Sequence, residues 1–391
     1  MHEQRIINKT VLLLSLVSLF TDMASEMLYP VMPLYLKEIG FSVAAIGILE
    51  GVAEAVAGLS KGYFGTWSDR AGVRMPFVRL GYTLSAISKP MMAAFTSVWW
   101  IFFARTVDRT GKGLRTGARD AMLSDASTEE TKGRVFGFHR AMDTTGAMIG
   151  PSLALIFLYF APQQYRQLFL WALLPGIAAI ITTFLIKEKK AAPVKKKEFP
   201  SFKSFYQYWQ RAPSSYKKLT GALLAFALFN SSDALLLLRM KETGTSDTAL
   251  IFVYIFYNAV YAVLSYPLGA MADKIGLKKV FISGLILFAM VYAGMSIKEN
   301  TYLYFLLFLL YGIYAAATES ISKAWISKLV GKDHVATAIG TYSGFQSIAA
   351  LLASSIAGLL WLYFGAIAAF MSTVIVTLIV IIYIYFKTEE I

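Results

Sequence analysis

The sequence predicts an all-α membrane protein of twelve transmembrane helices, arranged as two pseudo-symmetric six-helix bundles. Of the 391 residues, 57% are hydrophobic and only 16% are charged, which differs strongly from the composition of a soluble domain. Many apolar runs are long enough to cross a bilayer. In addition, residues 65–74 and 269–279 share one pattern, in which an acid, a base, a glycine and further bases follow a small residue. This repetition indicates a duplicated bundle.

The individual helices follow from apolar runs of roughly 20 residues, counted along the chain. In the first half they are predicted at 11–36, 43–65, 76–96, 98–119, 134–160 and 166–186. In the second half they are predicted at 218–238, 249–271, 279–297, 301–323, 334–361 and 365–386. The longest spans are expected to tilt or to extend beyond the membrane. The predicted domains are an N-terminal bundle over 1–186, a basic linker over 187–217 and a C-terminal bundle over 218–391.

Lysine and arginine gather on one side of these helices. The connections at 65–74 and 269–279 and the linker over 187–217 are all basic, which is typical of cytoplasmic loops. We therefore expect a multi-pass protein of a bacterial inner membrane with both termini in the cytoplasm. Within the linker, aromatic and basic residues over 199–216 predict either a short amphipathic helix on the inner leaflet or a disordered segment.

Several classes of protein are not expected. The formal net charge is +13, but most of it flanks the predicted helices, so it does not indicate a nucleic-acid partner. The chain has no cysteine, which excludes disulfides, and its three histidines are too few and too scattered for a metal cage. Met23 and Met27 could bind a soft copper ion, although packing is the simpler explanation. Without a phosphate-binding loop or a hydrolase motif, we expect neither an enzyme nor a cofactor.

The twelve spans, the central linker and the two Gly-x-x-x-Asp-(Arg/Lys)-x-Gly-x-(Arg/Lys) connections resemble the major facilitator superfamily over essentially the whole chain. The resemblance implies two halves around a midplane cavity that opens alternately to each side of the membrane. It also implies a cytoplasmic charge latch that stabilises the outward-open state. The gating residues assigned on this basis are Asp69, Arg70, Arg74, Arg119 and Asp120, with Asp273 and Lys274 as a weaker counterpart.

Two further family motifs are present in altered form. Arg105 resembles the arginine of a motif in the fourth helix, but Arg109 occupies the position of its glycine. Gly146, Gly150 and Pro151 resemble the start of an element associated with proton-driven exporters, although the second glycine pair of that element is missing. Glycines one turn apart also allow close helix approach, and a proline allows a bend. These three residues are interpreted as a gating pivot or as plain helix packing.

Ionisable residues inside the apolar spans are functional candidates, because a charge at membrane depth is costly unless it is paired or faces water. Asp22 and Glu26 are four residues apart and share one helix face. Neighbouring carboxylates in a low-dielectric site favour uptake of a proton. We therefore assign proton coupling to Asp22 and Glu26, together with Glu54 and Asp143. The alternative is that these carboxyl groups only hold the helices together.

The span predicted at 98–119 carries a basic stripe along one face, with cations at intervals of three or four residues. Its members are Arg105, Arg109, Lys112, Arg115 and Arg119. Asp108 offsets part of this charge. Two interpretations remain open, namely an internal ion network with carboxylates of the first two helices, or a surplus of cations that meets an anionic substrate. On the second interpretation Arg105, Arg109 and Lys112 bind substrate, together with His139.

The C-terminal half has fewer charges at membrane depth. Asp233 is a second-rank candidate for proton or substrate binding, and Glu319 is expected to pair with Lys323 one turn later. Tyr257 and Asn258 lie among tyrosines at helical spacing, which suits an amphipathic organic molecule but is also common at helix interfaces. We assign Asp233, Tyr257, Asn258 and Glu319 to the substrate-binding set.

Together these features predict a monomeric, proton-coupled secondary active transporter of a small organic solute, in contact with membrane lipid and working by alternating access. Export by antiport is the favoured direction. The alternative is proton-linked uptake of an anionic metabolite or metal chelate through the basic stripe. A receptor or lipid-handling protein without a transport cycle is a third possibility. The substrate itself is not predicted, because one fold accommodates many solutes.

Overall fold

The computed structural model describes residues 7–29, 31–41, 43–188, 204–231, 233–245, 247–297 and 301–388. Within these ranges the chain forms α-helices and one 3-10 turn, η1 (Lys332–His334), and no strand. Six helical segments of the described chain are long and apolar enough to cross a membrane. Helix α5 (Val98–Asp125) is not one of them, because its basic stripe lowers its hydropathy. The prediction of an all-helical fold is confirmed.

The chain divides into two compact units. Unit 1 comprises Met1–Ser127, Met142–Arg211 and Gly331–Gly344, and unit 2 comprises Thr128–Ala141, Ala212–Val330 and Phe345–Ile391. Two helices contribute to both units. Helix α6 (Lys132–Phe160) begins in unit 2 and continues in unit 1, whereas helix α15 (Val335–Lys387) begins in unit 1 and continues in unit 2.

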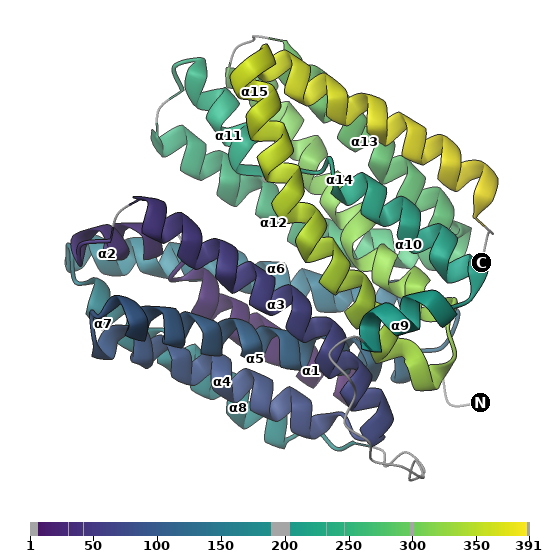
Figure 1. The fold of residues 1–391 in the computed structure, drawn as a ribbon, viewed down its shortest axis with the longest axis horizontal. Coiled ribbons are helices and arrows are strands. Elements are labelled where there is room, and N and C mark those ends of the chain that lie inside the picture. The colour runs from purple at the N-terminus through teal and green to yellow at the C-terminus, as the bar shows by residue number, and fades with distance from the viewer. Residues whose placement is uncertain are drawn as a thin grey trace. The chain divides into compact units, whose positions relative to one another are not determined.

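Unit 1 contains most helices from the first half of the chain. Besides α5 and the larger part of α6, its helices are α1 (Lys9–Glu26), α2 (Met32–Glu38), α3 (Val43–Ala71), α4 (Met75–Ala94), α7 (Tyr165–Trp171), α8 (Leu173–Phe184) and α9 (Ser204–Arg211). Helix α5 packs against both α3 and α4 (Figure 1). A Cβ atom on Gly81 would lie 2.7 Å from the carbonyl oxygen of Gly111. The absence of side chains at this crossing lets the backbones of α4 and α5 approach closely.

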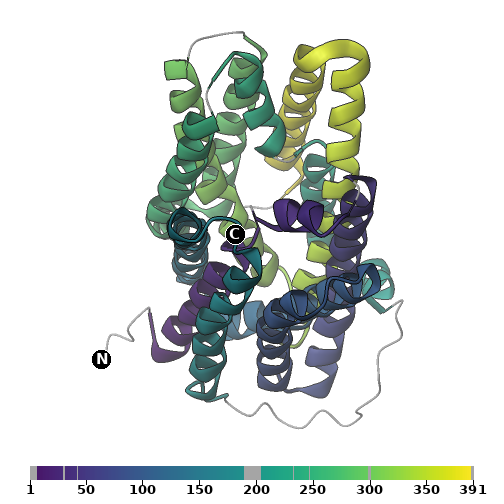
Figure 2. The same ribbon diagram turned by 90° about the vertical axis from the view of Figure 1, so that its left-hand side faces the viewer.

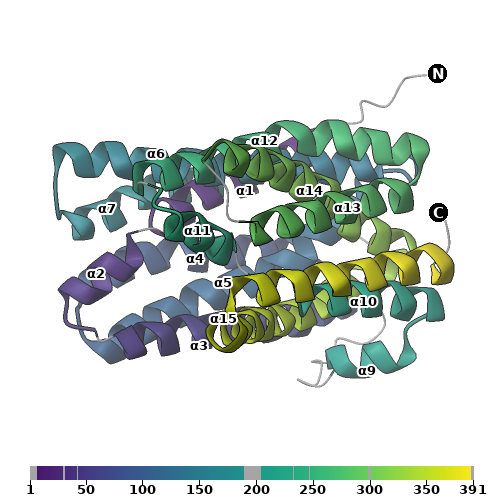
Figure 3. The ribbon, with the colours of Figure 1, turned by 90° about the horizontal axis from the view of Figure 1, so that it is seen from above.

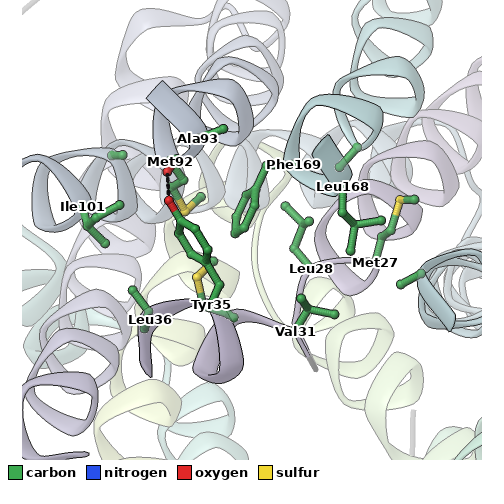
Figure 4. Close-up of a cluster of buried hydrophobic side chains, with 14 of the residues drawn as sticks. Met27, Leu28, Val31, Tyr35, Leu36, Met92, Ala93, Ile101, Leu168 and Phe169 are labelled. Atoms are coloured by element: carbon green, nitrogen blue, oxygen red, sulfur yellow. Dashed lines mark hydrogen bonds between the residues drawn. The ribbon is translucent and has the colours of Figure 1, made fainter. Parts of the chain in front are cut away.

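A cluster of buried hydrophobic side chains attaches α2 to α4, α5 and α7 (Figure 4). At its centre the Tyr35 hydroxyl donates a hydrogen bond of 3.0 Å to the carbonyl oxygen of Met92. The Tyr35 ring also lies 4.9 Å from the ring of Phe169. Tyrosine can be buried here because its ring is packed and its hydroxyl group has an acceptor. The cluster therefore fixes the segment that follows α1 next to α4.

Unit 2 contains α10 (Ser214–Ala227), α11 (Asp233–Glu242), α12 (Asp247–Ile275), α13 (Leu277–Ser296), α14 (Thr301–Lys328) and most of α15. Helix α14 packs against α12 and α13, and Figure 3 shows these three helices side by side. Helix α15 reverses its direction at Gly365, where φ is +84°. Figure 2 shows the two arms in yellow-green and yellow. Glycine adopts this left-handed conformation without a steric penalty.

Several predicted spans are divided or joined in the structure. Three predicted spans are each divided into two helices. The span 11–36 forms α1 and α2, the span 166–186 forms α7 and α8, and the span 218–238 forms α10 and α11. By contrast, the spans 334–361 and 365–386 form the single element α15, with non-helical backbone angles at Gly365.

Helix α9 forms within the 199–216 stretch, where a short amphipathic helix was one of two expectations, and it packs on α3. The centre of the Tyr208 ring lies 6.0 Å from the centre of the His334 ring, and both residues belong to unit 1. Burial raises the pKa of Tyr208, and the nearby carboxylate of Asp69 raises that pKa further. Tyr208 therefore anchors α9 to unit 1 through a packed, uncharged ring.

Candidate functional site

A cavity of about 110 Å³ lies within unit 1, between α1, α2, α4 and α5. Four cationic and two acidic side chains line it together with neutral and apolar ones. These six ionisable residues are Glu26, Lys89, Arg105, Asp108, Arg109 and Lys112. The structure thus brings Glu26, a predicted proton-coupling residue, together with three predicted substrate-binding residues of the basic stripe.

Asp108 is the central acceptor of this cavity. Its Oδ1 atom accepts hydrogen bonds from Lys89 Nζ at 2.7 Å and from Ser88 Oγ at 3.1 Å. Its Oδ2 atom lies 3.6 Å from Arg105 Nη1. Lys89 also donates a hydrogen bond of 3.2 Å to Ser25 Oγ on α1. A buried carboxylate is stable only when its oxygens are satisfied in this manner, so Asp108 and Lys89 hold α4 and α5 in register.

Glu26 is the last residue of α1 and lines the same cavity. The strongest charge interactions on its carboxyl group come from Lys112 and Arg109, followed by Asp143 and Lys89. Its position therefore differs from that of Asp108, whose partners are close hydrogen-bond donors. Both acids of this cavity therefore act on the basic stripe, Asp108 on Arg105 and Glu26 on Lys112 and Arg109.

The carboxyl groups of Asp22 on α1 and Asp143 on α6 are neighbours and act directly on each other. Two carboxylates this close repel each other, and a proton on one of them would relieve that repulsion. Glu26, one turn along α1, and Arg115 of α5 also act electrostatically on Asp22. Three of the four residues predicted for proton coupling therefore lie next to one another. The side chain of the fourth, Glu54, lies outside the described part of the structure.

Two glycines of α6 make this carboxyl pair possible. A Cβ atom on Gly146 would lie 2.3 Å from the carbonyl oxygen of Leu19, and one on Gly150 would lie 2.5 Å from that of Met23. Both distances are too short for any side chain, so α6 lies directly against α1. Pro151 follows within the same helix and is buried.

The C-terminal part of the basic stripe, towards the end of α5, takes part in a second network. Arg119 pairs with Asp120 at 2.8 Å and donates a hydrogen bond of 3.1 Å to Ser18 Oγ on α1. Arg115 donates to Ser85 Oγ, and its guanidinium group lies 4.6 Å from the centre of the Tyr82 ring. These two arginines therefore connect α5 with α1 and α4, which supports the internal-network interpretation for this part of the stripe.

The first duplicated connection binds the beginning of α15 within unit 1. Asp69 Oδ2 accepts hydrogen bonds from both the backbone N–H and the hydroxyl group of Thr337, each at 2.7 Å. Arg74 lies 3.7 Å from Asp69 and also pairs with Asp125. A Cβ atom on Gly65 would lie 2.6 Å from the carbonyl oxygen of Ala336. An acid at a helix N-terminus satisfies free N–H groups and complements the helix dipole.

The second connection repeats this arrangement within unit 2. Asp273 accepts hydrogen bonds from the backbone N–H groups of Gly133 and Arg134 at 2.7 and 2.8 Å, at the beginning of α6. A Cβ atom on Gly269 would lie 2.2 Å from the carbonyl oxygen of Gly133. By contrast, Arg70 and Lys274, the bases that follow the two acids, are exposed. In each connection, therefore, the acid and the glycine contact the beginning of the other helix, whereas the base that follows the acid does not take part in the contacts described above.

The remaining predicted substrate-binding residues belong to unit 2. Glu319 Oε2 lies 3.2 Å from Arg140 Nη2, and Arg140 also donates a hydrogen bond to the Tyr261 hydroxyl group. Tyr257 and Asn258 are buried on α12, and Tyr257 packs against the rings of Tyr254, Phe308 and Tyr311. His139 is buried near the beginning of α6. Asp233 begins α11, but its side chain lies outside the described part of the structure.

A family model described as Major Facilitator Superfamily matches residues 14–238 and 218–391. The chain belongs to this superfamily. An uncharacterized MFS-type transporter from Methanocaldococcus jannaschii is 33% identical over 366 residues, which cover 92% of this chain and 90% of the relative. A Lactococcus lactis protein named as a multi-drug resistance efflux pump PmrA homolog is 23% identical over 324 residues, which cover 81% of this chain and 79% of that protein.

Among solved structures, the human organic anion transporter MFSD10 (TETRAN) matches with a TM-score of 0.79 and 15% identity, covering 96% of this chain and 98% of that chain. At this identity the match shows the fold alone. As a member of the major facilitator superfamily, the chain is a multi-pass integral membrane protein and a secondary transporter rather than an enzyme. Transporters of this superfamily move small solutes.

Two site residues of this superfamily member were missed by the sequence analysis. Lys89 lies inside the span predicted at 76–96, where the cost of a charge in an apolar segment was a sufficient signal. Arg140 follows His139 on α6 and forms the ion pair with Glu319. Its role depended on a contact between α6 and α14 that no local pattern in the sequence indicates.

Proposed function

We propose that this chain is a proton-coupled secondary transporter of a small organic solute. The observation that carries the proposal is the close pair of carboxyl groups of Asp22 and Asp143, with Glu26 one turn along α1 from Asp22. A transporter that uses a proton gradient needs a carboxyl group that gains and loses a proton within the membrane, next to groups whose charge the substrate alters. This cluster supplies both, because Glu26 also lines the cavity of unit 1.

Two directions of transport follow from different observations. Export by antiport agrees with the efflux pump named for the Lactococcus lactis relative and with the Gly146, Gly150 and Pro151 element of α6. Proton-linked uptake of an anion is supported by the cavity, whose ionisable lining carries four cationic and two acidic side chains. In both cases we assign substrate contacts to Arg105, Arg109 and Lys112 of α5.

For the unit 2 residues of the substrate set, which are His139, Asp233, Tyr257, Asn258 and Glu319, we propose a role in the same transport cycle. We propose gating for Asp69 and Asp273, whose hydrogen bonds to helix beginnings would break and re-form during alternating access. Arg74 supports Asp69 in this role. The proposed gating set is completed by Arg70, Arg119, Asp120 and Lys274, together with Gly146, Gly150 and Pro151 as the pivot in α6.

The experiment that tests proton coupling uses the purified full-length chain in proteoliposomes loaded with a pH-sensitive dye. A panel of cationic, neutral and anionic solutes is added outside. Proton efflux during solute influx identifies an antiporter, and proton influx with an anion identifies a symporter. We expect Asp22→Asn and Asp143→Asn each to abolish the proton flux, whereas the exposed-acid control Glu38→Gln retains it. Unchanged proton flux in both aspartate variants would refute the assignment.

A further inference from the structure

The cavity of unit 1 has an unequal charge balance. Among the described side chains, its lining contains Lys89, Arg105, Arg109 and Lys112 but only two acids. One of these acids, Asp108, is already held by Lys89 and Ser88. The neighbouring groups outside the lining do not remove the excess. With Asp22 and Asp143 both counted as ionised, and Arg115 beside Asp22 counted as a further cation, five cations still face four acids.

Glu26 is therefore the acid that decides how positive the cavity is. The titratable groups that face it are Asp22 on its own helix, Lys89 on α4, Arg109 and Lys112 on α5, and Asp143 on α6. Ionised Glu26 offsets one of the α5 cations. When Glu26 takes up a proton, that offset is removed and the positive excess of the lining increases by one charge.

We infer that this cavity binds the anionic group of a small organic anion, and that a proton on Glu26 accompanies tight binding. The inference rests on the proposed transport function and names its substrate class. A negatively charged ligand repels an ionised Glu26 and is attracted by the cations opposite. Anion binding and protonation of Glu26 therefore stabilise each other, as any two linked binding events must.

The lining and the size of the cavity restrict the ligand. Arginine guanidinium groups bind carboxylate and phosphate through paired hydrogen bonds, which favours these two groups over a diffuse anion. The volume of about 110 Å³ is well below the roughly 300–1,000 Å³ of pockets for drug-sized ligands. Leu28, Met32 and Met92 add an apolar wall. A compact carboxylate or phosphate group on a short organic skeleton fits this combination.

The mutual stabilisation of the bound anion and the proton on Glu26 determines how their movements across the membrane are coupled. A proton and an anion that favour the same loaded state travel together, so the cavity is built for proton-anion symport. A cationic drug would instead compete with the α5 cations and with the proton. The charge balance of the cavity therefore favours proton-linked uptake if the solute is an anion. It does not favour binding of a cationic solute, as export of a cationic drug would require.

Binding by the detergent-purified full-length chain tests the inference without any transport measurement. The probes are succinate, benzoate, glucose 6-phosphate and methanesulfonate, each paired with a neutral counterpart, namely succinamide, benzamide, glucose and dimethyl sulfone. Thermal unfolding is recorded with increasing probe concentration at several pH values from mildly acidic to mildly alkaline. Because a ligand that binds the folded state raises the unfolding temperature, the titration yields a dissociation constant.

We expect at least one anion, and not its neutral counterpart, to bind with an affinity that increases as the pH falls. In Glu26→Gln the same anion should bind at high pH as tightly as it binds the wild type at low pH. In Arg109→Gln its affinity should fall at least about tenfold, the usual scale for losing a bidentate charged contact, and Arg109→Lys should recover part of it. Lys218→Gln, an exposed cation outside the cavity, should bind like the wild type.

Three outcomes would overturn the inference. They are equal binding of anions and neutral counterparts, anion binding that does not change with pH or with Glu26→Gln, and no stabilisation by any soluble anion of the panel. Stabilisation only by phosphatidylglycerol added in mixed detergent micelles would assign the cations to a lipid headgroup, and this fourth outcome would also overturn the inference. Because this assay requires no proton flux, loss of coupling in the proteoliposomes and loss of anion binding are separate results.

Discussion

Thr337 donates two hydrogen bonds to Oδ2 of Asp69, one from its backbone N–H and one from its hydroxyl group, and each is 2.7 Å long. Asp273 makes the equivalent contact with the backbone at Gly133 and Arg134. Each duplicated connection thus contains an acid that caps a helix from a distant part of the chain. The repeated sequence pattern is explained by this repeated contact, which stabilises one helix beginning in each unit.

The Asp69 contact predicts a graded loss of stability. Asp69→Ala removes the acceptor and should lower the free energy of unfolding by about 1 kcal/mol, the typical value of a helix cap. Asp69→Asn retains an acceptor oxygen and should lose less, and Thr337→Val should lose only the hydroxyl contribution. Thermal unfolding in detergent measures all three variants. Equal unfolding temperatures for Asp69→Ala and the wild type would show that the cap contributes nothing.

The α1–α6 crossing predicts that a single methyl group is harmful at Gly146. Gly146→Ala would place a Cβ atom 2.3 Å from the carbonyl oxygen of Leu19, so the helices must separate, at a cost of about 1–3 kcal/mol. Separation also lengthens the Asp22–Asp143 contact, so proton flux should fall together with the unfolding temperature. Gly358→Ala is the matched control, because nothing lies within 4 Å of its added Cβ. Similar behaviour of the two variants would contradict the packing argument.

The Lys89–Asp108 pair predicts that the double variant Lys89→Met, Asp108→Leu is more stable than the single variant Lys89→Met. Lys89→Met leaves a buried carboxylate without its nearest cation and should cost about 3–5 kcal/mol. Adding Asp108→Leu removes the isolated charge and should restore most of the unfolding temperature, although anion binding stays weak. A double-mutant cycle measured by thermal unfolding checks this. Additive losses would mean that the two side chains do not depend on each other.

The raised pKa of Tyr208 predicts how α9 responds to alkaline pH. Its folded-state pKa lies above the unfolded value of about 10, so its contribution to stability is fully present below that value. The contribution is lost as the pH rises through the folded-state pKa, because the half-buried phenol then ionises near Asp69. An ultraviolet difference titration of the wild type against Tyr208→Phe should show this tyrosine ionising after the exposed ones. Ionisation at its ordinary pH would show that α9 does not bury it.

Helix positions were predictable where apolar runs end at clear signals. The predicted span 76–96 corresponds to α4 (Met75–Ala94), and 279–297 corresponds to α13 (Leu277–Ser296). The division of 218–238 into α10 and α11 was not predicted, because hydropathy measures how apolar a segment is and does not report where its backbone leaves the helix. The same limit applies to 11–36, which contains the step from α1 to α2.

The candidate site was predictable in residue type but not in pairing. The cost of a charge in a membrane helix correctly drew attention to Asp22, Glu26 and the α5 stripe, and the same rule applied to Lys89 would have completed the cavity lining. The partners of these charges depend on which helices touch. Asp143 is 121 residues from Asp22 in the sequence, and only the close approach of α6 to α1 brings the two carboxyl groups together.

The reversal of α15 at Gly365 has a consequence for biosynthesis and for engineering. Because one residue with φ of +84° replaces a loop, no separate connecting segment lies between the two arms. We expect them to insert from the translocon as one hairpin. Loops between membrane helices usually tolerate epitope tags. A tag inserted at Gly365 would instead disrupt the helical backbone of both arms of α15.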